Sequence, residues 1–484
     1  MHHSSRFLAA FLTLLLIMTA CAPAPTPTIA PPAAQPTVVP TVISPTATAV
    51  PITYESSLPA VLWGENNKQH LLFPLDPSSG EALPGYTPIS LGRNFSYAFS
   101  PDRRTLAAAI FPNESAHDGS LLLIDLSAWK TQRFDLKLEG WVGAMAFRPD
   151  GGQLVISHGD EQTSRLTLFD LKQQAVVIQG ETDLLYPRLK FASGGNALML
   201  YGLAIKDGSV ENQMAGGTPQ VLLLDAATLS PRWRATLDGV REGIFAKDGK
   251  TTLTSTQIQE GQAMYLSPGV AFAPDRDALY IVHADSRQLT TADFGAQKVQ
   301  TVDIHARLSW FEQLLSLTAS IAHAKVTDGT NKQIAVSPDG RFLYVVGMDS
   351  DSTLDKQGNW QLSQTPLGLE IIQTSDGSRV QHIQTSAAEL SLSPDGRFLY
   401  LRNWALDQDG GLGTEVFDTS SHQIVASKVG LYLTPTLSMN GEPLLASTYS
   451  LSESLHHMTV LLPDDLSVLG EWKGAGYIAW LTPQ

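Results

Sequence analysis

Histidine and carboxylate residues recur in the polar segments that separate short apolar runs along this chain. An imidazole can exchange protons near neutral pH or bind a metal, and a carboxylate can act as an acid or base or coordinate a hard cation. Residues spread so widely can act together only if the fold brings their segments to one face. The candidates are His117, Asp118, His158, Asp160, His283, Asp285, Asp349, Asp351, Asp407, Asp409 and His456.

One of these segments has the alternating acids of a cation site. Asp349, Asp351 and Asp355 could supply oxygen ligands to calcium. The run lacks the glycine at position six and the acid at position twelve of the helix-flanked calcium loop. Calcium therefore stays an open alternative, and the sequence predicts no other cofactor.

The elements that must position these residues are short strands joined by a recurring turn. The clearest copies are Ser337-Pro338-Asp339-Gly340 and Ser393-Pro394-Asp395-Gly396, each between two apolar runs. Proline presets the first central residue of the turn, and glycine takes the positive φ that lets two antiparallel strands close. Each copy predicts a hairpin. Arg103 and Arg276 stand where glycine is expected, so we expect strain in those two turns.

Further apolar runs that end in Asp, such as 121–125 and 166–170, predict a third strand, and a fourth follows. Four short strands that recur about every 45 to 65 residues predict propeller blades, which bury their faces by stacking in a ring. Blades open near residues 96, 141, 186, 270, 331, 387 and 433. Residues 60–64, 70–76 and 81–89, with the C-terminal segment as their inner strand, predict a composite blade that closes the ring.

The pattern resembles the bacterial WD40-like family of propeller repeats, including the YVTN type. This resemblance covers nearly all of residues 58–484 and implies an all-β fold: a single β-propeller of eight four-stranded blades, or seven if one repeat is irregular. It implies little about function, because propellers host unrelated activities. Two insertions are expected, a short hairpin within 240–268 and an amphipathic helix within 307–323.

The turns that join first and second strands lie at one end of the blades, so the loops between second and third strands all emerge at the other. Those loops carry the histidines and acids named above, and loops on a rigid scaffold are common recognition sites. This face is the predicted binding face, and the alternative for each residue is a solvated acidic loop. The sequence has no Gly-x-Ser-x-Gly, His-Glu-x-x-His or phosphate-binding Gly-Lys-Ser/Thr motif.

We therefore expect a binding or scaffolding module for a protein, peptide or glycan rather than an enzyme. The alternative is a propeller-type hydrolase or lactonase with an active site at the channel mouth. Such a site would gather acids and histidines from different blades and leave no linear motif. The formal net charge of −15 argues against a nucleic-acid partner. We expect a monomer.

The N-terminal segment predicts export. Residues 1–20 have the order of a secretory signal, with Arg6 before an apolar run and small residues before Cys21, the only cysteine in the chain. Met18-Thr19-Ala20-Cys21 resembles a bacterial lipobox, which implies that Cys21 is lipidated and that the protein is anchored to the outer face of the cell membrane or cell envelope. The alternative is a plain signal peptide with an incidental cysteine. Residues 21–53 are rich in Pro and Thr and predict a disordered stalk, which leaves 54–484 as the propeller.

Overall fold

The computed structural model describes most of residues 60–480 and divides the chain into two compact units, 1–53 and 54–484. The segments within 60–480 that lie outside the described residues are 67–68, 76–82, 93, 112–118, 161, 206–215, 248–262, 307–328, 355–359, 394, 405–411, 432–435, 438–443, 451–454 and 475–476. The described residues are all strand, turn and loop, with no helix among them. In this part of the chain, then, no helix is long and apolar enough to cross a bilayer.

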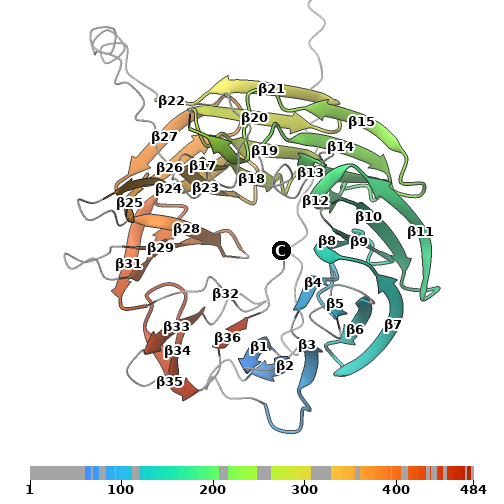
Figure 1. Ribbon diagram of the computed structural model, residues 1–484. Coiled ribbons are helices and arrows are strands. Elements are labelled where there is room, and N and C mark those ends of the chain that lie inside the picture. Colours follow the sequence, from blue (N-terminus) through green and yellow to red (C-terminus); the bar gives the residue numbers. More distant parts are fainter. Residues whose placement is uncertain are drawn as a thin grey trace, which may run out of the picture. The chain divides into compact units, whose positions relative to one another are not determined.

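Residues 60–480 form eight β-sheets that follow one another around a common centre (Figure 1). We number them as blades 1 to 8, in chain order from β4. Each of the first four blades consists of four consecutive antiparallel strands. Their bounds are β4 Asn94–Phe99, β5 Thr105–Phe111, β6 Gly119–Asp125 and β7 Lys130–Leu138; β8 Trp141–Phe147, β9 Gln153–Gly159, β10 Ser164–Asp170 and β11 Ala175–Thr182; β12 Leu184–Phe191, β13 Ala197–Ala204, β14 Gln220–Asp225 and β15 Pro231–Thr236; and β18 Gly269–Phe272, β19 Ala278–Val282, β20 Gln288–Asp293 and β21 Lys298–Asp303.

Blades 5 to 7 repeat the pattern, and blade 8 is composite. Their bounds are β23 Gly329–Val336, β24 Phe342–Leu354, β26 Leu369–Gln373 and β27 Ser378–Ile383; β28 Ala387–Leu392, β29 Phe398–Asn403, β30 Gly413–Asp418 and β31 Gln423–Val429; β32 Thr436–Leu437, β33 Leu444–Ser450, β34 Leu455–Leu461 and β35 Val468–Gly474; and β36 Tyr477–Trp480, β1 Ala60–Asn66, β2 Gln69–Leu75 and β3 Ile89–Gly92. The eight-bladed expectation is confirmed.

Blade 8 takes strands from both ends of the described chain. β36 pairs antiparallel with β1, with Trp480 opposite Leu62 and Tyr477 opposite Glu65. The outer strand of this blade is β3, which lies at the end of the predicted 81–89 segment rather than along it. Trp480 thus lies in one sheet with residues that precede it by more than four hundred positions.

Side-chain hydrogen bonds explain why the recurring turn forms. The Ser337 hydroxyl donates to Asp339 Oδ1 at 2.6 Å and accepts from the Phe342 amide at 2.9 Å, which ties both sides of the turn to one side chain. Gly340 takes the left-handed region, with φ at 70°. Arg103 also adopts a positive φ, of 56°, as expected, whereas Arg276 does not, so the expectation of strain there was wrong.

The hydrophobic core lies between neighbouring blades. β5 and β6 are buried along almost their whole length, because blades cover both faces of these middle strands. Outer strands alternate instead, as the burial of β31 shows, because only one of their faces is covered. In Figure 1 the first strands of the blades lie towards the centre, and β7, β11 and β15 lie on the outside.

Blade 5 carries additional strands. β16 (Gly243–Ala246) and β17 (Ala263–Ser267) form the predicted antiparallel hairpin, and β17 adds to β23 in parallel. At the other edge, β22 (His305–Ala306) pairs in parallel with β27. β24 extends into a hairpin with β25 (Trp360–Pro366). The helix expected within 307–323 lies outside the described residues.

Candidate binding face

The connections between second and third strands share one end of the blades with the connections between successive blades. We call this end the loop face, and the opposite end, with the Ser-Pro-Asp-Gly turns, the turn face. Of the predicted site residues, Cys21, His117, Asp118, Asp355, Asp407 and Asp409 lie outside the described residues. The backbone of His456 lies in β34, opposite Tyr449.

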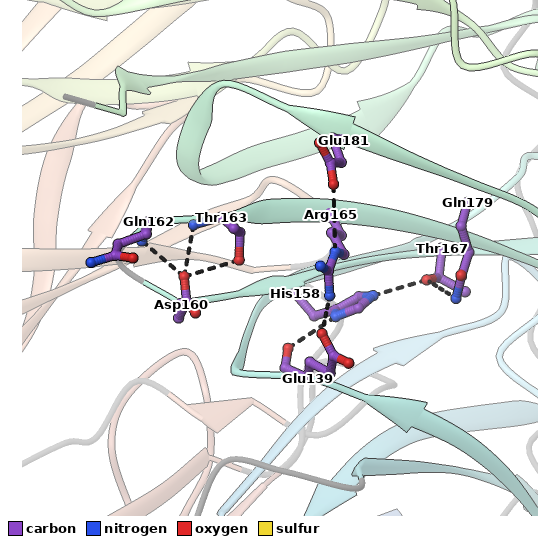
Figure 2. Close-up of polar contacts among 9 residues, drawn as sticks. All are labelled: Glu139, His158, Asp160, Gln162, Thr163, Arg165, Thr167, Gln179 and Glu181. Atoms are coloured by element: carbon purple, nitrogen blue, oxygen red, sulfur yellow. Dashed lines mark hydrogen bonds and ion pairs between the residues drawn. The ribbon is translucent and has the colours of Figure 1, made fainter. Parts of the chain in front are cut away.

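His158 lies at the loop-face end of β9, but its side chain is directed inward and is only 3 % exposed (Figure 2). Its Nδ1 lies 3.0 Å from the Glu139 carbonyl oxygen, and its Nε2 lies 2.9 Å from Thr167 Oγ1. A carbonyl oxygen can only accept, so Nδ1 carries the proton and the Thr167 hydroxyl donates to Nε2. Burial lowers the pKa of His158, which favours this neutral ring. His158 therefore links β9 both to β10 and to the connection between blades 1 and 2.

His283 in blade 4 repeats the threonine contact of Nε2 but not the Nδ1 bond: its Nδ1 is buried and has no hydrogen-bond partner among the described residues. Its ring is fully buried, Nε2 lies 2.7 Å from Thr290 Oγ1, and burial lowers its pKa. Asn403 in blade 6 is also fully buried, and its amide donates to Glu415 Oε2 at 3.0 Å. All three residues stand at the same position of their repeats, eight residues after the turn aspartates Asp150, Asp275 and Asp395.

Asp160 lies in the exposed loop that follows β9. Its Oδ1 accepts hydrogen bonds from the Gln162 amide at 2.8 Å and the Thr163 amide at 2.7 Å (Figure 2). The Gln162 bond, with the bonds from Thr163, lowers the pKa of Asp160. The Asp160 carboxylate therefore stabilises the loop through a single oxygen atom, Oδ1.

Three of the predicted site residues, His283, Asp285 and Asp349, lie around Lys332 between blades 4 and 5. Lys332, on the inner strand β23, donates from Nζ to the carbonyl oxygens of His283 and Ser286, the latter at 3.4 Å. Burial lowers the pKa of Lys332, while Glu370, Asp349 and Asp285 oppose that shift. The sequence did not single out Lys332. Its position on the inner strand β23, six residues before the turn proline, is the only signal that it gives.

The two aspartates of this cluster have partners of their own. Asp285 Oδ2 lies 3.4 Å from the Arg241 guanidinium, and Asp349 Oδ1 accepts from the Thr330 hydroxyl at 2.7 Å. The Lys332 ammonium of blade 5 donates to carbonyl oxygens of blade 4, so it links these two blades.

The proposed calcium run is extended strand rather than loop. Asp349 and Asp351 lie in β24, opposite Thr365 and Ser363 of β25. The run forms strand because backbone pairing with β25 continues to its end at Leu354. Among the described residues, no three His, Cys, Asp or Glu side chains are grouped as metal ligands.

Exposed aromatic side chains mark the loop face, and no sequence pattern singles them out. Four aromatic residues in the described part of the chain are exposed, namely Tyr86, Trp141, Tyr265 and Trp404. Trp141 begins β8, Trp404 follows β29 and Tyr265 lies in β17 where it adds to the loop-face end of β23, so these three belong to the loop face. Tyr86 lies between β2 and β3, on the turn face.

A groove also opens where blades 2 and 3 meet. Its volume is about 490 Å³. The lining residues are Gln162, Thr163, Ser164, Glu181, Thr182, Asp183, Ile205, Leu222, Leu224, Leu229, Pro231 and Arg234. Gln162, Thr163 and Asp183 place one end of the groove on the loop face.

Comparisons with known proteins return structural likenesses of low sequence identity. No family model matches the chain, and no curated protein matches it. The chain is similar to a dihydro-heme d1 dehydrogenase NirN in complex with DHE, with 12 % identity over 88 % of this chain and 76 % of that chain, at a TM-score of 0.49. It is also similar to a eukaryotic initiation factor, with 11 % identity over 88 % of this chain and 98 % of that chain, at a TM-score of 0.48. The β-propeller fold follows from the eight blade-like sheets themselves.

Proposed function

We propose that this protein is a lipid-anchored, extracytoplasmic β-propeller that uses its loop face to bind or scaffold a protein, peptide or glycan at the cell envelope. The observation that carries the proposal is the concentration of exposed aromatic side chains on that face. Trp141 is 47 % exposed and Tyr265 is 54 % exposed. Tryptophan and tyrosine dominate binding hot spots, because each buries a large rigid surface at low entropic cost.

The binding test uses the full-length chain with Cys21→Ser, screened against arrays of envelope glycans and peptides. Ligands found in this way are then measured with Trp141→Ala and Trp404→Ala variants. We expect each substitution to weaken binding about tenfold or more, as hot-spot truncations do. Tyr86→Ala, on the turn face, is the matched control and should bind normally. Equal loss in the control, or unchanged binding in both tryptophan variants, contradicts the proposal.

The anchor is tested separately from the binding. The proposal expects labelled palmitate to be incorporated into the wild-type chain in cells and the label to disappear with Cys21→Ser. Two or more acyl chains hold a protein durably on a membrane, since each buried methylene adds about 0.8 kcal/mol. An unlabelled membrane-bound protein, or a labelled Cys21→Ser variant, contradicts the anchor.

A hydrolase or lactonase is the second candidate, and the cluster around Lys332 favours it. Asp285 and Asp349 both lie near a buried ammonium on an inner strand, and His283 joins them through its carbonyl. Perturbed pKa values in such clusters accompany active sites as well as structural networks. Hydrolysis of ester or lactone substrates that is lost in Asp349→Asn, with the fold intact, supports this candidate. No turnover across such a panel counts against it.

A further inference from the structure

Additional strands extend blade 5 at its loop-face end. There β16, β17, β23 and β24 lie side by side in that order, and β25 follows β24. The β16 edge of this sheet is covered, because the Gly216 amide donates to the Ile244 carbonyl oxygen at 2.5 Å and Gly217 forms a β-bridge with Glu242. The other edge is β25, which pairs with β24 alone in the part of the chain that the structure describes.

The outer strands of the eight blades carry features that keep natural sheet edges from pairing with other chains, namely bulges, charges and short length. The strands β11, β15, β27, β31 and β35 each have a shift in register against the neighbouring strand. Both β7 and β21 begin with lysine and carry at least one further charge. The strand β3 has only four residues. Each blade therefore has a protected outer edge.

The strand β25 lacks these features. Its seven residues, Trp360–Pro366, include no charged residue. It runs in continuous register with β24 from end to end, without a bulge. Proline also protects sheet edges, because it has no amide, but Pro366 occupies only the last position of the strand. The remaining edge is long, regular and uncharged.

The hydrogen bond that follows β25 shows which of its backbone groups form this edge. The Leu367 amide donates to the Gly347 carbonyl oxygen of β24 at 2.9 Å. In an antiparallel pair, residues whose amide and carbonyl point to the partner strand alternate with residues whose amide and carbonyl point away. The amides and carbonyls of Gln364, Leu362 and Trp360 therefore point away from β24, and the edge offers alternating donors and acceptors.

The size of the edge decides which partner it fits. Seven strand residues span about 24 Å. A stable protein–protein interface takes about 20–30 residues from each side, so pairing of β25 with β25 of a second copy is too small by itself to hold a dimer. An extended peptide needs no further surface, because its main-chain hydrogen bonds supply the affinity. Blade 5 already accepts strands in this way, since β17 adds to β23 and β22 adds to β27.

We propose that the outer edge of β25 binds an extended peptide segment of about five residues by strand addition. The peptide backbone pairs with the outward amides and carbonyls of Trp360, Leu362 and Gln364. Residues with β-branched side chains suit the segment because they favour an extended chain, and proline at its centre is excluded because it has no amide to donate. The proposal rests on the proposed function in that β25 belongs to the loop face, and it names the partner as a peptide and the contact as backbone pairing.

The probe is a fluorescein-labelled hexapeptide of alternating threonine and valine, titrated with the full-length Cys21→Ser chain and followed by fluorescence anisotropy. We expect saturable binding. The matched peptide carries N-methyl groups on its two central amides; because successive amides point to opposite edges of a strand, neither of its edges can pair fully. It should bind about tenfold more weakly or worse. No binding of the threonine–valine peptide, or equal binding of the two peptides, overturns the proposal.

Variants of Gln364 locate the contact. Gln364→Pro removes an outward amide and leaves the bonds to β24 in place, because edge strands tolerate proline where the amide faces solvent. Binding should fall about tenfold or more. Gln364→Ala keeps the amide and is the matched control, which should bind as the wild type does. Unchanged binding in Gln364→Pro, or equal loss in both variants, overturns the proposal.

The tryptophan variants separate this proposal from the proposed function. Loss of peptide binding in Trp141→Ala with full binding in Gln364→Pro assigns the peptide to the exposed aromatic residues, so the proposed function stands and the β25 site is overturned. Full binding in Trp141→Ala and Trp404→Ala with loss in Gln364→Pro supports the β25 site and removes the role proposed for the aromatic residues.

Hydrogen exchange resolved to single residues gives an independent readout. Without peptide, the amides of Trp360, Leu362 and Gln364 should exchange faster than those of Ser363 and Thr365, which point to β24. Saturating peptide should slow the exchange of the three outward amides. Slow exchange of these amides in the absence of peptide would show that the chain itself covers this edge, and it overturns the proposal.

Discussion

The junction between blades 1 and 2, which we call the filled junction, and the junction between blades 2 and 3, which we call the open junction, are built from the same repeat and both hold a buried core, yet a groove lies beside the core of the second. In the first junction, Phe134 and Phe169 pack against each other within a core that also contains Leu154 and Ile156. In the second, Gly180 and Leu224 take the corresponding positions. Leu224 packs in a buried core with Leu166 and Leu168, Leu229 lies against Gly180, and a groove of about 490 Å³ lies beside this core. The same repeat positions thus carry an aromatic pair at one junction and a glycine with aliphatic side chains at the next.

The two junctions also differ in what lies at their loop-face ends. His158 shares its strand face with Leu154 and Ile156, so its buried ring belongs to the filled junction. The open junction ends in the exposed ion pair of Arg234 and Asp183. The filled junction thus has a titratable buried group, and the open junction has solvated charges.

The largest effect is expected at the filled junction. Phe169 is fully buried. Its replacement by alanine should lower the free energy of unfolding by about 3–5 kcal/mol, because the side chain leaves a cavity in a closed core. Leu224→Ala should cost less, about 2 kcal/mol, because a smaller side chain is lost and the cavity that it leaves opens onto the groove that Leu224 lines. Urea titrations of both variants measure the difference. Equal losses would show that the two junctions are packed alike.

The second-largest effect is expected on acidification, which should lower the free energy of unfolding through the buried histidine of the filled junction. The pKa of His158 in the folded protein is lowered by burial from its ordinary value of 6.5, so the unfolded chain binds more protons than the folded one just below that value. The contribution of neutral His158 is thus complete above pH 6.5 and is lost as the pH falls through the lowered folded pKa. His283 acts in the same direction.

The measurement is the free energy of unfolding from about pH 8 to about pH 5 for the wild type and His158→Gln. We expect stability to fall on acidification and the fall to be shallower in the variant, because one titrating group is absent. Identical pH profiles would show that His158 does not titrate with unfolding.

Filling the open junction should produce a smaller effect of opposite sign. Gly180 has an ordinary φ, so a side chain is compatible with its backbone. Gly180→Phe should raise the free energy of unfolding by about 1 kcal/mol, because it removes a flexible glycine and adds apolar surface against Leu229, which lies 3.3 Å away at Cδ1 and must shift to make room. Differential scanning calorimetry measures the shift in Tm, with Gly180→Ala as the control that adds a β-carbon but little volume. A lower Tm for the phenylalanine variant alone would mean that Leu229 cannot move aside.

The sequence predicts the blades and their turns well and the surroundings of individual polar side chains poorly, and the reason is physical. Ser337 and Ser393 bond within their own turns, so the hairpin signal is local and is visible in four consecutive residues. His158 and His283 also stand at one repeat position, but their burial depends on threonines of the next strand, so their place in the interior does not follow from their polarity. The groove is lined by residues of two blades, such as Thr182 and Leu224, which give no signal unless the repeats are aligned position by position.

The smallest effect is expected for the ion pair at the mouth of the open junction. Arg234 donates from Nη1 to Asp183 Oδ2 at 2.7 Å, and the two side chains are 43 % and 51 % exposed. An exposed pair contributes only about 0.2–1 kcal/mol, since water screens the charges and both side chains lose freedom. Asp183→Asn should therefore lower the free energy of unfolding by about 0.5 kcal/mol or less, and added salt should reduce that difference further. Urea titrations at low and high salt measure it. A loss as large as that of Leu224→Ala would show that this pair, rather than the aliphatic core, holds blades 2 and 3 together, and the contrast between the two junctions would then lie in charge instead of in packing.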